Sequence, residues 1–159
     1  MMRHIFAVPL LAALTATAFV APAQAGAGAG GEGLIKMKSQ YSVDKTLDRL
    51  ASALESKGLT VFARIDHGAN AKGADLELRP TQVLIFGNPN LGTPLMQARQ
   101  TMGIDLPQKA LAYQDTEGEV WLAYNDPAYL AERHGITSEA GIRAKIAKAL
   151  KAFAQKATQ

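Results

Sequence analysis

Polar and glycine residues gather at three points where apolar segments of the chain stop, and their types could bind a ligand or move a proton. His67 is the strongest single candidate, because an imidazole can act as base, acid or metal ligand near neutral pH. A histidine at the end of a strand can also do no more than bond to a loop carbonyl. The candidate ligand-binding residues are Asp66, His67, Gly87, Asn88, Gly92, Thr93, Tyr124, Asn125 and Asp126.

Residues 87–93 have the composition of an anion site. They join a predicted strand to the start of a predicted helix, where free backbone N–H groups and the helix dipole favour negative charge. Glycine, asparagine and proline are also the residues that a tight turn uses. The pattern therefore leaves an anion site and a plain turn both open.

Catalytic and metal chemistry have weaker support. Asp66 or Asp126 could orient His67 as a general base, but no G-x-S-x-G motif accompanies them, and the catalytic residues of any reaction stay unknown. His134 could join His67 and Asp66 around a metal, yet the two histidines lack ligand spacing, so we expect no metal site. The absence of cysteine excludes disulfides, thiolate metal ligands and thiol nucleophiles. Any cofactor stays unknown.

Apolar periodicity predicts the elements that must position these residues. Residues 43–58 form a helix capped by Ser42, and a short helical crossover near residues 69–74 would make the second and third strands parallel. That arrangement brings His67 and Asn88 to one sheet edge. Further helices are expected after Thr93 (its cap, with Pro94 first), over residues 126–134, and after Ser138. The predicted strands are residues 34–39, 59–67, 83–86, 109–114 and 119–125.

The order of these elements predicts an α+β fold. We expect a two-layer domain over residues 34–157, with a mixed sheet of about five strands and helices packed mainly on one face. The last helix carries an apolar stripe that the core needs, so its lysines are interpreted as a solvated face rather than a lipid-binding one. The stripe comprises Ile142, Ile146, Leu150 and Phe153.

The N-terminus has the pattern of an export signal. Arg3 precedes an apolar run, and small residues around Ala25 suit a signal peptidase, so we predict that residues 1–25 are removed. Residues 26–33 are rich in glycine and read as a flexible tether. The predicted product is periplasmic or secreted and is no membrane protein after cleavage. The net charge of +3 is too small to indicate nucleic acid.

Several short segments of the chain follow one another in a recognisable order. They are IDH at 65–67, LELRPT at 76–81, IFGNP at 85–89, GTPLM at 92–96, LP at 106–107, KA at 109–110, VWL at 120–122 and YNDP at 124–127. In this order they resemble the family called domain of unknown function 302. The resemblance covers residues 34–135 and implies a small α+β domain whose members tend to form dimers. It brings no established reaction, cofactor or catalytic residue.

Three classes of function fit these observations. The leading hypothesis is a non-enzymatic module that binds a small polar or anionic ligand near His67, Asn88 and Asn125. The second is a homodimeric structural or interaction protein whose polar strand ends only satisfy loops. The third is a small enzyme that uses His67 as general base. An open pocket at the strand ends would favour the first class, and a filled one the second.

Overall fold

The computed structural model describes residues 33–159. The predicted signal, its cleavage point and almost all of the tether lie outside this range and stay predictions. Within it, no helix combines the length and the apolar character needed to cross a bilayer.

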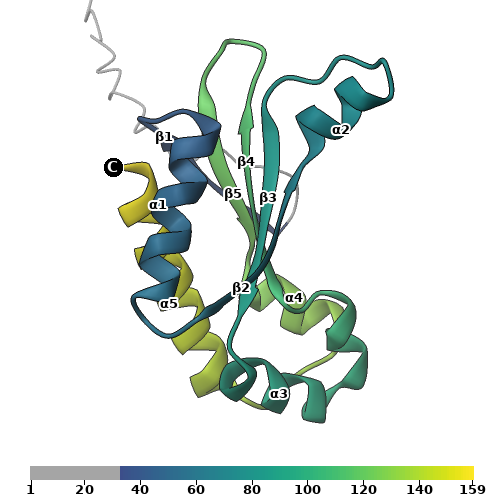
Figure 1. The fold of residues 1–159 in the computed structure, drawn as a ribbon. Helices are drawn as coiled ribbons and strands as arrows, with labels where there is room; N and C mark the ends of the chain where they lie inside the picture. The colour runs from purple at the N-terminus through teal and green to yellow at the C-terminus, as the bar shows by residue number, and fades with distance from the viewer. Residues whose placement is uncertain (1–32) are drawn as a thin grey trace, which may run out of the picture.

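Five strands form one sheet in the order β1-β5-β4-β3-β2, and every neighbouring pair is antiparallel (Figure 1). The predicted α+β class with about five strands is confirmed. The mixed pairing is wrong, because β2 and β3 run antiparallel with Asp66 opposite Gln82. The chain between them forms a short helix, α2, and an extended return, so it turns back instead of crossing the sheet. The strands are β1 (Leu34–Ser39), β2 (Thr60–Asp66), β3 (Thr81–Gly87), β4 (Gln108–Gln114) and β5 (Val120–Asn125).

Two long helices lie side by side on one face of the sheet, as Figure 1 shows. The first, α1, begins after Ser42, whose side chain accepts from the backbone N–H of Lys45, as predicted. Shorter helices gather at the ends of the sheet. The helices are α1 (Val43–Glu55), α2 (His67–Gly73), α3 (Pro89–Ala98), η1 (Gln100–Ile104, a 3₁₀ helix), α4 (Pro127–Arg133) and α5 (Ala140–Thr158).

Two predicted helix starts are wrong. Helix α3 begins at Pro89 with Asn88 as its N-cap, so Pro94 lies inside the helix and Thr93 is not the cap. Asn88 followed by Pro89 supplies a side-chain acceptor and a preset backbone angle five residues earlier. The residue before α5 is Glu139, in a left-handed conformation with no side-chain cap, rather than Ser138.

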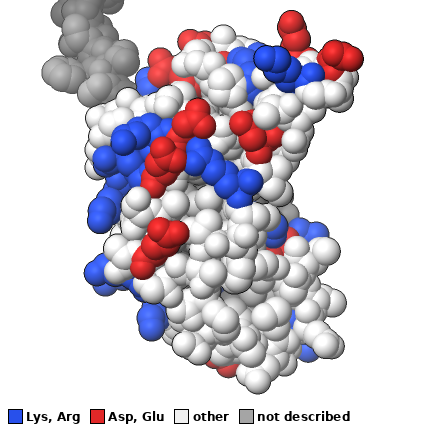
Figure 2. All heavy atoms as spheres, viewed as in Figure 1, with Lys and Arg blue, Asp and Glu red and all other residues white. Residues whose placement is uncertain are grey.

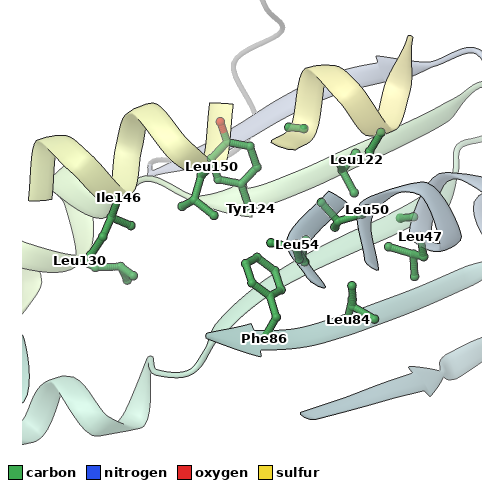
Figure 3. Packing of buried hydrophobic residues seen from close by; sticks show 14 of the residues in the cluster. Leu47, Leu50, Leu54, Leu84, Phe86, Leu122, Tyr124, Leu130, Ile146 and Leu150 are labelled. Atoms are coloured by element: carbon green, nitrogen blue, oxygen red, sulfur yellow. The ribbon is translucent and has the colours of Figure 1, made fainter. Parts of the chain in front are cut away.

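The core lies between the sheet and the two long helices (Figure 3). Alternate residues of β3, β4 and β5 face the helices, as the period of two in a strand requires. Leu47 and Leu54 of α1 are fully buried against this surface, which confirms the helical spacing read from the sequence. The labelled residues of Figure 3 are Leu47, Leu50, Leu54, Leu84, Phe86, Leu122, Tyr124, Leu130, Ile146 and Leu150.

Candidate functional site

A pocket of about 250 Å³ opens at the sheet edge where β3 ends and β2 begins. The walls come from α3, the loop before β4 and the middle of α5, and none of the lining side chains is charged. Figure 2 shows that the surface over α3 is largely free of Lys, Arg, Asp and Glu, in contrast to the upper part of the same face. The lining residues are Leu59, Phe62, Phe86, Gly87, Asn88, Pro89, Leu91, Gly92, Thr93, Met96, Leu106, Pro107, Gln108, Ile146, Ala149, Leu150 and Phe153.

The structure separates the predicted site residues into three places. Gly87, Asn88, Gly92 and Thr93 line the pocket. Tyr124 and Asn125 end β5 and Asp126 follows it. Because β5 runs in the same direction as β3, these residues lie at the same edge as the end of β3, but they do not line the pocket. Residues 66–67 lie at the opposite edge, because β2 is antiparallel to β3. The expectation that His67 and Asn88 share an edge is therefore wrong.

At that opposite edge, Asp66 serves as a cap for α2. Its Oδ1 accepts from the N–H of Ala69 at 2.9 Å, and its Oδ2 accepts from Nε2 of Gln82 at 3.1 Å. His67 is exposed, and its ring forms no hydrogen bond within residues 33–159. Asp66 therefore does not orient His67 as a general base here, because both of its carboxylate oxygens are bonded elsewhere.

Asp126, the polar residue after β5, also forms hydrogen bonds with nearby backbone groups. Asp126 caps α4 by accepting from the N–H of Ala128 at 2.9 Å, and its own N–H donates to the carbonyl of Gly33 at 2.8 Å. Burial raises the pKa of Tyr124, and the nearby charge of Asp126 raises it further. Tyr124 is thus a neutral member of the core rather than an exposed ligand group.

The first-turn amides of α3 are already bonded. Asn88 Oδ1 accepts from the N–H of Asn90 at 2.9 Å, and the Asn88 carbonyl accepts from the N–H groups of Leu91 and Gly92 at 3.0 Å each. Pro89 has no N–H. An anion at this terminus would have to compete with Asn88, so the local geometry is that of a capped helix.

An aromatic side chain stands beside the pocket because of a strand irregularity. The pairing of β2 with β3 shifts register between Val61 and Ala63, which leaves Phe62 unpaired as the extra residue of a bulge. Its side chain is 55% exposed and still lines the pocket. Bulges commonly re-aim a side chain next to a functional site.

Sequence reasoning missed Gln108, which lines the pocket and is only 8% exposed. The predicted fourth strand began one residue later, at residue 109. Extending its alternation backward places Gln108 on the same face as Ala110 and Ala112, both buried. A polar residue in an apolar register was the signal that could have found it.

A second cluster that the sequence does not reveal surrounds His134, the residue that could have joined His67 and Asp66 around a metal. Its Nε2 lies 2.6 Å from a carboxylate oxygen of Asp105, and its Nδ1 lies 3.0 Å from the hydroxyl oxygen of Thr101. Among residues 33–159 no three His, Asp or Glu side chains converge as metal ligands would. The histidine joins η1 to the end of α4.

Comparison with known proteins identifies the domain. The family model described as "Domain of unknown function DUF302" matches residues 35–153. The chain belongs to this family. The match includes most of α5, so the DUF302 domain extends past residue 135, where the resemblance read from the sequence ended.

A solved DUF302 structure has the same fold. The crystal structure of an uncharacterised conserved DUF302 protein from Bacillus stearothermophilus superposes with a TM-score of 0.72 at 20% identity. The alignment covers 80% of this chain and 99% of that one. At this identity the likeness establishes the fold alone.

Curated relatives share the domain at higher identity. Proteins named "Fluoride-specific ion channel FluC 1", from Brucella suis biovar 1 (strain 1330), and "FluC 2", from Brucella melitensis biotype 1 (strain ATCC 23456 / CCUG 17765 / NCTC 10094 / 16M), are each 51% identical over 116 residues. The match covers 72% of this chain but only 46% and 43% of those proteins. The DUF302 chain therefore spans less than half of their length.

Proposed function

We propose that this DUF302 protein is a non-enzymatic module that binds a small molecule with an apolar body in the pocket beside α3. The observation that carries the proposal is an open pocket of about 250 Å³ whose lining is mostly aliphatic and aromatic. Such a lining with a few polar groups is typical of small-molecule sites. Since a cavity of about 150 Å³ admits benzene, this one suits on the order of ten non-hydrogen atoms.

The polar groups of the pocket sit at one side, where β3 meets α3 and β4 begins. Asn88, Thr93 and Gln108 are its only lining residues with polar side chains, so they would fix the orientation of the ligand. Phe62 and Phe153 supply aromatic surface for its apolar part.

The cellular setting is part of the same proposal. The pattern of residues 1–25 supports a periplasmic or secreted product, which N-terminal sequencing of the exported protein tests: a start at Met1 would exclude cleavage. Dimer formation, which the family resemblance implies, is tested by light scattering of the purified protein.

Thermal shift against a panel of small apolar and amphipathic molecules tests the binding proposal. A ligand at 100 times its Kd adds about 2.7 kcal/mol and should raise Tm by several degrees. Because the names of the relatives specify fluoride, the panel includes fluoride beside phosphate and carboxylates.

The pocket is tested by filling it. Ala149→Leu adds volume to its wall, and we expect ligand shifts to vanish in this variant. Ala144→Leu is the matched control, since Ala144 is an exposed alanine of the same helix outside the pocket. Equal shifts in both variants would exclude the pocket, and no shift with any molecule would favour the interaction-protein alternative.

A further inference from the structure

Gln108 is a buried amide within an apolar wall. It pairs with Phe86 in the sheet register, so its side chain faces the helices beside fully apolar neighbours. Its carboxamide forms no hydrogen bond within residues 33–159, and both of its polar atoms keep some contact with solvent. The group therefore keeps its donors and acceptor available at the pocket surface, where Gln108 is one of the lining residues.

The pocket offers no counter-charge. No Lys, Arg or His lines it, and the first-turn amides of α3 are bonded to Asn88. A carboxylate or phosphate entering this space would lose its hydration without gaining a cation, which is strongly unfavourable. A neutral ligand avoids this cost.

We infer that Gln108 is the specificity-determining residue and that the ligand is a neutral molecule bearing an amide-like group that both donates and accepts. This inference rests on the proposed binding function and names its ligand class. A carboxamide satisfies both ends of Gln108, with ligand N–H donating to Oε1 and ligand carbonyl accepting from Nε2. A ketone can accept from Nε2 but cannot donate to Oε1, and an anion is repelled by the partial negative charge of Oε1.

Three probes of about ten non-hydrogen atoms each separate these classes, at the size that the pocket suits. Octanamide donates and accepts, 2-nonanone only accepts, and octanoate is anionic. Binding of each to the purified protein is measured by titration calorimetry, in wild type, Gln108→Leu and the control Gln97→Leu, which alters an exposed glutamine of α3. If Gln108→Leu does not fold, Gln108→Met replaces it.

In wild type and in Gln97→Leu we expect octanamide to bind about 5-fold more tightly than 2-nonanone, the value of one added hydrogen bond, and at least 10-fold more tightly than octanoate. In Gln108→Leu both probes lose the hydrogen bond from Nε2, and octanamide alone also loses the one to Oε1. Both should therefore bind more weakly, and the preference for octanamide over 2-nonanone should disappear. Octanoate binding as well as octanamide, or an amide preference that survives in Gln108→Leu, would overturn the inference and leave the pocket proposal intact. Failure of all three probes to bind wild type would refute both.

Discussion

The carboxylate of Asp105 lies 2.6 Å from Nε2 of His134 and thereby bonds the residue after η1 to the end of α4. The histidine side chain is 7% exposed and the aspartate 12%. Thr101 bonds the other ring nitrogen, and Arg133 adds a contact of 3.3 Å to the second carboxylate oxygen. These contacts fix the segment that leads into the pocket wall at Leu106 and Pro107.

Replacing His134 should loosen this segment. We expect His134→Ala to lower the free energy of unfolding by about 1–3 kcal/mol, because it leaves the largely buried Asp105 carboxylate with only its longer contact to the more exposed Arg133. Urea denaturation measures the loss. In a double-mutant cycle, Asp105→Asn should cost little more once His134 is gone. Fully additive losses would contradict a coupled pair.

The hairpin between β4 and β5 should weaken in acid. Partial desolvation alone would raise the pKa of Asp115, but hydrogen bonds from Trp121 Nε1 and from the N–H groups of Glu119 and Glu117, with the charge of Lys36, together lower it below its ordinary 3.8. A lowered folded-state pKa contributes stability above the unfolded value and loses it as pH falls through the folded value.

Fluorescence of Trp121, the only tryptophan, reports on this hairpin. We expect wild type to lose stability below about pH 4, and Asp115→Asn to be less stable at neutral pH with a flatter acid dependence. Asp75→Asn, at an exposed site, serves as control. An Asp115→Asn curve parallel to wild type would rule out this carboxylate as the cause.

Tyr124 should ionise only at strongly alkaline pH. Its pKa is raised above 10.0, first by burial and then by Asp126. Since the folded value is the higher one, its contribution to stability is present below about pH 10 and is lost as pH rises through the folded value. Asp126→Asn preserves the helix cap but should bring the Tyr124 pKa closer to 10.0.

Phenolate absorbance, taken as the difference between each protein and the same protein carrying Tyr124→Phe, isolates this group from the other tyrosines. An unchanged titration in Asp126→Asn would show that burial alone sets the pKa.

Substitution of one buried and one exposed leucine should distinguish a core position from a surface position. Leu84→Ala, in a side chain 1% exposed, should destabilise the fold by about 2–5 kcal/mol because it leaves a cavity under α1. Leu76→Ala, at 66% exposure, should change the stability by less than about 0.5 kcal/mol. Denaturant midpoints measure both. A large loss at Leu76 would mean that this leucine is covered in solution.

Local signals in the sequence were sufficient for most elements. Ser42 starts α1, and Gly58 and Gly118, with φ of 73° and 83°, occupy turns where a side chain would be strained. The helical spacing of Leu47, Leu50 and Leu54 correctly places these three leucines on the buried face of α1. These features depend on residues a few positions apart, so they can be predicted from composition and spacing.

Features that depend on distant partners could not be predicted in this way. The direction of β2 relative to β3 is set by how α2 and its return segment pack. The hydrogen-bond partner of His134 is Asp105, which lies 29 positions earlier in the sequence. Gln108 lines a pocket only because residues of α5, far along the chain, form part of its wall. The place of Asp66 and His67 relative to the other candidate residues therefore depended on sheet topology, which local periodicity does not determine.

The pairing of the first strand with the last imposes an order on biosynthesis. Ser39 of β1 can pair with Val120 of β5 only after β5 has been synthesised, 81 positions later. The N–H of Gln40 likewise donates to the carbonyl of Thr158, which is synthesised later still. At 5–20 residues per second the ribosome needs on the order of ten seconds between the two paired strands. During that interval α1 cannot bury its apolar side fully, because β5 and α5, two of the elements that cover it, have not yet been synthesised.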